Sequence, residues 1–73
     1  MKTKYKYVEF VHLSSLDGGS WECRDRETRN KVGWIQWSYE NKCYRWQQKR
    51  GMPLSGKFLT EIIDFMQRLT DHG

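Results

Sequence analysis

The apolar residues of this chain change their spacing once, near residue 50, and this change restricts the fold more than any other feature. Up to Gln48 the chain consists of short segments in which aromatic and β-branched residues alternate with polar ones, as they do in strands. The stretch KRGMPLSG at residues 49–56 then interrupts the pattern with two glycines and a proline. From Lys57 onward the apolar residues follow helical spacing. The predicted order is therefore several strands followed by one helix.

Four strands are predicted from the alternation, and polar turn-forming residues separate them. Their approximate ranges are 5–13, 21–26, 31–38 and 43–48. The tightest turn is predicted within SSLDGGS at residues 14–20, where Asp17-Gly18-Gly19 lies. In the first strand, alternation places Tyr5, Tyr7 and Val11 on one face and Val8 and Phe10 on the other.

The third predicted strand, KVGWIQWS, differs from the others because it carries apolar side chains on both faces. Alternation places Val32 and Trp34 on one face and Ile35 and Trp37 on the other, which is typical of a central strand. Gly33 within it predicts a bulge, or the close approach of a bulky neighbour such as a cross-strand tryptophan.

One helix is predicted over residues 56–70, with Ser55 as its N-cap. Its polar face, which includes Glu61 and Asp64, is expected to be solvated. The apolar residues form a single stripe: Phe58, Leu59, Ile62, Ile63, Phe65, Met66 and Leu69. The predicted fold class is α+β, a single domain over residues 1–73 in which this amphipathic helix packs on one face of a small antiparallel β-β-β-β-α sheet.

The sequence contains four tryptophans and four tyrosines, and one helix can cover only one face of a sheet. The covered face is expected to meet Phe58, Ile62, Phe65 and Leu69. At least one of Trp34 and Trp37 is expected on the uncovered face. Two alternatives remain open for that face. Either the first strand or long arginine and lysine stems cover it as a second small core, or it is an exposed aromatic patch that binds a partner.

The second alternative predicts a binding surface, because tryptophan, tyrosine and arginine are enriched at binding hot spots. The predicted binding residues are Trp34, Trp37, Tyr44, Arg45, Trp46, Arg24, Arg26, Lys49 and Arg50. The favoured hypothesis is a non-catalytic module that binds a protein and acts by steric occupation. One alternative is a small single-stranded nucleic-acid-binding protein whose aromatic rings stack on bases. Another is a homodimer that buries this face against its own copy. A net charge of +4, from basic and acidic residues interspersed along the chain, does not decide between them.

The titratable residues form no catalytic or metal-binding pattern. His12 and His72 have no carboxylate or thiol at a catalytic spacing, and Cys23 and Cys43 do not form a CxxC pair. We therefore predict no enzyme activity, no cofactor and no metal. Cysteines on two strands that flank a third would lie about 9–10 Å apart, whereas a disulfide needs Cα atoms within about 7 Å. Reduced, buried thiols are therefore predicted.

The expected location is the cytoplasm, without a membrane partner. The stretch MKTKYKYVEFVHL lacks the apolar run of a signal peptide. No stretch approaches the roughly 20 apolar residues of a transmembrane helix.

The segments SWECRDRETRNKVGWIQW, YRW and FLTEIIDFMQRL together resemble a family of short uncharacterised proteins from phages, prophages and bacteria. The matching positions, over roughly residues 20–70, are Trp21, Gly33, Ile35, Trp37, Leu59, Ile62, Phe65 and Leu69. The stretches CYRWQQ and SYENK differ from the family pattern, which affects the surface of the fourth strand and not the fold. The resemblance implies a phage or mobile-element setting and no known activity. By analogy with other small phage proteins, the partner would be a host protein or an antiviral-defence factor.

Overall fold

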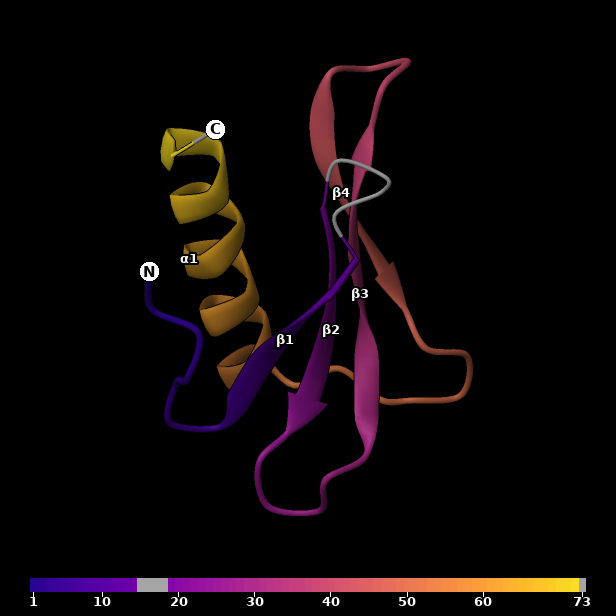
Figure 1. Cartoon of the computed structure of the whole chain (residues 1–73). Coiled ribbons are helices and arrows are strands. Elements are labelled where there is room, and N and C mark those ends of the chain that lie inside the picture. Colours follow the sequence, from indigo (N-terminus) through magenta and orange to yellow (C-terminus); the bar gives the residue numbers. More distant parts are fainter. Residues whose placement is uncertain (15–18, 73) are drawn as a thin grey trace.

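The computed structural model describes residues 1–14 and 19–72, and within them it has the predicted α+β class (Figure 1). Four antiparallel strands form one sheet in the order β1-β2-β3-β4, and a helix covers one face. The bounds are β1 Val8–Ser14, β2 Ser20–Asp25, β3 Lys31–Ser38, β4 Cys43–Gln48 and α1 Gly56–His72. Ser55 directly precedes α1, and its carbonyl accepts the first helical hydrogen bond from Leu59. The centre of the predicted turn, Asp17-Gly18, lies outside the described residues.

Strand β1 begins three residues later than predicted because the chain before it turns back along the strand. The Tyr5 amide donates to the Val8 carbonyl at 2.9 Å, and the Phe10 amide donates to the Thr3 carbonyl at 2.8 Å. This reversal buries the Tyr5 ring beside Phe10, with ring centres 5.7 Å apart. The predicted grouping of Tyr5 with Val11 is therefore wrong.

Residues 1–7, here called the N-terminal segment, pack along α1 (Figure 1). The Glu61 carboxylate accepts hydrogen bonds from the amides of Tyr7 and Val8, both at 3.0 Å. The Tyr5 hydroxyl donates to Asp64 at 2.7 Å. The prediction of a solvated role is therefore wrong for Glu61, whose carboxylate ties the helix to residues more than fifty positions earlier in the chain. The Asp64 side chain is 45% exposed, as predicted, and it also accepts the long-range bond from Tyr5.

The core lies between α1 and the sheet and is centred on Phe65. Its ring stacks on Phe10 with centres 3.9 Å apart, and the ring of Trp21 approaches it edge-on at 5.1 Å. The helical stripe that faces the sheet is narrower than predicted, because Leu59 and Ile63 are 41% and 55% exposed. The buried apolar residues are Tyr5, Val8, Phe10, Cys23, Val32, Ile35, Ile62, Phe65 and Leu69.

A bulge in β3 explains a further difference from strict alternation. Cys23 pairs with Gly33, but the next residue of β2, Arg24, pairs with Lys31, so Val32 is an extra residue in the ladder. Val32 is fully buried in the core. Its predicted place on the same face as the neighbouring tryptophan is therefore wrong.

Candidate functional site

The pleat of β3 and β4 divides the predicted binding aromatics between the two faces of the sheet. Ile35 is fully buried in the core, and its partner across the ladder, Trp46, packs against the same core. Trp37 and Tyr44 share this helix-covered face by alternation and form an edge-to-face pair with ring centres 4.9 Å apart. Trp34 points to the opposite face, here called the open face. The prediction that at least one central tryptophan would lie there is confirmed.

Charged side chains around Glu22 cover part of the open face. Glu22 is only 3% exposed, and its carboxylate pairs with Arg24 and with the Lys31 Nζ at 3.2 Å. Lys31 Nζ also lies 6.0 Å from the ring centre of Trp34. Burial acts to raise the pKa of Glu22, but the hydrogen bonds from the two cations outweigh it and hold the pKa below its usual value. Long basic stems therefore cover the β2 side of this face, whereas Gln36, Arg45 and Gln47 on the β3–β4 side are exposed.

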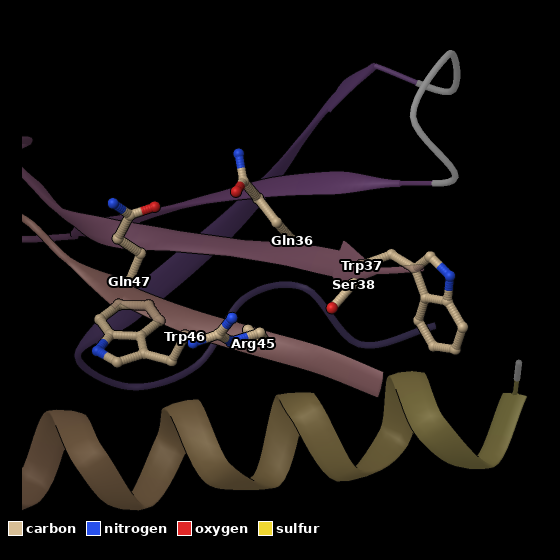
Figure 2. Close-up of a pocket in the computed structure, with 6 residues that line it drawn as sticks. All are labelled: Gln36, Trp37, Ser38, Arg45, Trp46 and Gln47. Atoms are coloured by element: carbon tan, nitrogen blue, oxygen red, sulfur yellow. The ribbon is translucent and has the colours of Figure 1, made fainter. Parts of the chain in front are cut away.

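The β3–β4 side of the sheet contains two hollows that share residues. A hollow of about 280 Å³ is lined by Ser20, Gln36, Trp37 and Tyr39. In Figure 2 the side chains of Gln36 and Gln47 point away from α1, whereas the indole of Trp37 hangs from the end of β3 on the helix side. Trp37 lies at the end of β3 and lines both hollows. The larger hollow, about 450 Å³, and its lining define the β4 surface: Gln36, Trp37, Ser38, Arg45, Trp46 and Gln47.

Trp46 joins β4 to the rest of the sheet by covering Gly33. A Cβ atom on Gly33 would lie 2.6 Å from two ring carbons of Trp46 and 2.5 Å from the carbonyl oxygen of Gln47. The predicted close approach of a cross-strand tryptophan is thus confirmed. The Trp46 Nε1 is buried and has no hydrogen-bond partner in the described part of the chain. Trp46 therefore has a structural role as well as a position beside the hollow.

The remaining predicted basic residues do not all gather at this surface. Arg26 lies elsewhere, because its guanidinium donates to the Tyr5 carbonyl at 2.7 Å and holds the N-terminal segment. Arg45 is exposed within the β4 surface, and Lys49 and Arg50 are exposed directly after β4. Three of the five predicted basic residues therefore lie in or beside β4, and Arg24 belongs to the cluster around Glu22.

Basic charge is concentrated in β4 and in the segment that follows it. Residues 41–60 contain five basic residues and no aspartate or glutamate. This leaves eight basic and nine acidic residues for the other 53 positions, so the net positive charge of the chain comes entirely from this segment. The prediction of interspersed charges is wrong for this segment, and counting charge in windows would have found it.

Both cysteines are free thiols in different surroundings. Cys23 lies in the core, where burial above all raises the pKa of its thiol to about 12. Cys43 is exposed at the start of β4, so the burial predicted for both thiols is wrong for this one. The His12 ring packs against Trp21 with ring centres 4.5 Å apart and the two ring planes tilted by 37°. In residues 1–14 and 19–72, no group of three or more histidine, cysteine, aspartate or glutamate residues is placed to hold a metal ion.

Comparisons of this chain with protein-family models, curated proteins and solved structures returned no match. The resemblance to short phage and bacterial proteins stays a prediction. Within the described residues, no helix is both long enough and apolar enough to cross a membrane.

Proposed function

We propose that this protein is a non-catalytic protein-binding module that engages its partner through the β4 surface. The observation that carries the proposal is a hollow of about 450 Å³ on an exposed edge strand, bordered by Trp37 and by the guanidinium of Arg45. A concave surface with tryptophan and arginine has the composition of a binding hot spot. The mechanism is steric occupation, since a bound module excludes other ligands from the same area of the partner.

Single-stranded nucleic acid is the second candidate ligand, because the segment 41–60 is basic throughout. A stacking platform needs aromatic faces beside basic side chains on one surface. Here Trp34 is on the open face and has a lysine above its ring, whereas Trp37, Tyr44 and Trp46 belong to the helix-covered face. At the hollow Trp37 and Trp46 lie beside a single basic side chain, Arg45. The aromatic rings therefore do not form one row along the basic segment, which favours a protein partner.

The resemblance of residues 20–70 to short phage and bacterial proteins supplies a setting for the proposal. In that setting the partner is a host protein or an antiviral-defence factor, and occupying its surface blocks its activity. This part of the proposal rests on the resemblance alone.

Affinity capture from a lysate of the native host, with and without nuclease, tests the choice of ligand. The matched variants are Arg45→Glu in the β4 surface and Arg29→Glu in the turn between β2 and β3, which change the charge equally. Wild type and Arg29→Glu should retain a stoichiometric protein after nuclease treatment, and Arg45→Glu should lose it. Equal recovery with both variants, or recovery of nucleic acid alone, would contradict the proposal.

Trp37→Ala tests whether the hollow carries the affinity. Removing a hot-spot tryptophan should cost at least about 2 kcal/mol of binding free energy, measured by titration calorimetry with the captured partner. The fold should tolerate the change, because Trp37 is not among the residues packed against the core. Trp34→Ala, which removes an indole outside the hollow, is the control. Wild-type affinity in a folded Trp37→Ala variant would show that the site lies elsewhere.

A further inference from the structure

The two edges of the sheet differ in whether their backbone is paired. At the outer edge of β1, the Phe10 amide donates to the Thr3 carbonyl at 2.8 Å, and Lys4 forms a bridge with Glu9. The N-terminal segment therefore occupies the first part of that edge, from Val8 to Phe10. Strand β4 is the other edge, and within the described residues no segment pairs with its outer side.

The register shows which backbone groups of β4 point outward. The Lys49 amide donates to the Val32 carbonyl at 2.9 Å. Because an antiparallel ladder alternates, the odd-numbered residues of β4 exchange hydrogen bonds with β3. The N–H and C=O groups of Tyr44, Trp46 and Gln48 therefore point away from β3, and among the described residues none of them has a backbone partner. These residues present alternating donors and acceptors along one exposed line.

A second polypeptide strand is the ligand that complements such a line, because a peptide backbone offers both donors and acceptors. A nucleic-acid backbone offers mainly phosphate acceptors and would leave the outward carbonyls unpaired. Along β4, Tyr44 and Trp46 lie on the helix-covered side, and Arg45 and Gln47 lie on the open side. A strand beside β4 would gain most from apolar side chains next to the aromatics and from carboxylates next to Arg45.

Charge argues against a second copy of this chain as the added strand. Lys42, Arg45, Lys49 and Arg50 lie within or beside β4, and residues 41–60 contain no carboxylate to pair with them. Two β4 strands side by side would therefore place basic groups together without compensation, which is unfavourable. An acidic segment has the complementary charge.

We propose that β4 accepts an extended acidic segment of the partner protein as a fifth strand, in which apolar and carboxylate side chains alternate. This inference rests on the proposed function and specifies how the partner binds. Backbone hydrogen bonds to Tyr44, Trp46 and Gln48 supply affinity, and Arg45 selects acidic segments.

The test uses the whole chain and a synthetic peptide of about seven residues, the length of an ordinary strand. Valine and glutamate alternate in the peptide, its ends are blocked, and a fluorophore reports binding by anisotropy. Amide hydrogen exchange, followed residue by residue by NMR, reports the backbone. The peptide should slow exchange at Tyr44, Trp46 and Gln48. The amides of Arg45 and Gln47 already face β3 and should change little.

Two backbone-methylated versions of the peptide provide the matched control. Each is methylated on alternate nitrogens, so one version has lost the N–H groups that face β4 and the other has lost those that face solvent. The version without the N–H groups that face β4 should bind at least about tenfold more weakly than the parent peptide. The version without the N–H groups that face solvent should bind as the parent does. A peptide of alternating valine and lysine should not bind. Arg45→Glu should weaken binding of the acidic peptide about fivefold, and Arg29→Glu should leave it unchanged.

Several results would overturn strand addition while leaving protein binding intact. In both of the following cases, capture that depends on Arg45 would still be observed. In the first, the two methylated peptides lose binding equally. In the second, the peptide binds without slowing exchange at the amides of Tyr44, Trp46 and Gln48. Without peptide, exchange at the three outward amides could slow as the protein concentration rises. Together with a dimer mass by light scattering, this result would assign the β4 edge to a second copy of the chain. Protection of the same amides by oligothymidylate would assign it to nucleic acid. Loss of Arg45-dependent capture would refute the proposed function itself.

Discussion

Replacing Gly33 with alanine should destabilise this fold, although alanine is normally the better residue in a strand. The backbone of Gly33 does not have a positive φ, so an alanine would meet no backbone strain there. At such positions the change usually stabilises a protein by about 0.4–1 kcal/mol, because it restricts the unfolded chain. The expected reversal of sign comes only from the atoms around the new methyl group.

The magnitude follows from what would have to move. The methyl carbon would lie 2.6 Å from two carbons of the Trp46 ring and 2.5 Å from the Gln47 carbonyl oxygen, whereas ordinary contact begins at 3.4 Å. The ring packs against the core, and the carbonyl belongs to the ladder with β3, so neither can move without disturbing these contacts. Overpacking of this kind costs about 1–3 kcal/mol. Because both backbone and ring must shift, we expect a net loss of about 2 kcal/mol, out of a total stability of roughly 4–11 kcal/mol for a domain of this size.

Thermal and urea denaturation followed by circular dichroism measure this loss, which corresponds to a fall in Tm of about 8–16 °C. Gly56→Ala is the matched control, because a Cβ at Gly56 meets no atom of the described residues within 4 Å. That variant should be neutral or more stable. Adding Trp46→Leu to Gly33→Ala should recover part of the Gly33→Ala penalty, since the ring contact is removed and the carbonyl contact stays. A Gly33→Ala protein as stable as wild type would refute the close approach of Trp46.

Three further predictions concern ionisable groups. In the native protein an alkylating reagent should add one group, at the exposed Cys43, and Cys23 should react only after unfolding, which mass spectrometry can count. Because the pKa of Glu22 is lowered in the folded protein, its carboxylate stabilises the fold above the usual carboxyl pKa of about 4.3. This stability is lost as the pH falls through the lowered pKa. In urea titrations, the free energy of unfolding of Glu22→Gln should therefore fall less on acidification than that of wild type. Burial, with the hydrogen bond to Asp64, raises the pKa of Tyr5 to about 12. The neutral Tyr5 hydroxyl therefore stabilises the fold fully below pH 10, and this stability is lost as the pH rises through about 12. Tyr5→Phe should lose about 1 kcal/mol at neutral pH and most of this alkaline dependence, and an unchanged alkaline midpoint would contradict this.

Local patterns were sufficient to predict most elements of the fold. The ranges predicted for the third and fourth strands match β3 and β4, because alternation within a strand depends only on neighbouring residues. The position of Tyr5 could not be predicted in this way. Its burial depends on the chain reversal, which the backbone hydrogen bond from Phe10 to Thr3 holds, and on the bond from its hydroxyl to Asp64. No local pattern links these residues. The bulge at Val32 was missed for a similar reason, because it is a property of the pairing between two strands.

The sequence indicates the residue types of the candidate site, but not how they are placed in space. Alternation alone already separates Trp34 from Trp37, because residues three positions apart in a strand point to opposite faces. It does not reveal that β4 is an open edge, since this depends on the strand order and on where the N-terminal segment pairs. Arg45 and Trp37 were named among nine candidates, and the hollow that brings them together is a result of the three-dimensional arrangement.

The N-terminal segment gives the sheet a defined valence. A sheet with two open edges can add strands on both sides, so copies can join without limit and form fibres. Here the backbone of Thr3 covers the β1 edge at Phe10, and Glu61 holds the segment in place. A strand that pairs with the proposed β4 site therefore does not find a second edge that is open along its whole length. Removing residues 1–4, which leaves the core residue Tyr5 in place, would uncover the Phe10 amide and open both edges of the sheet to added strands.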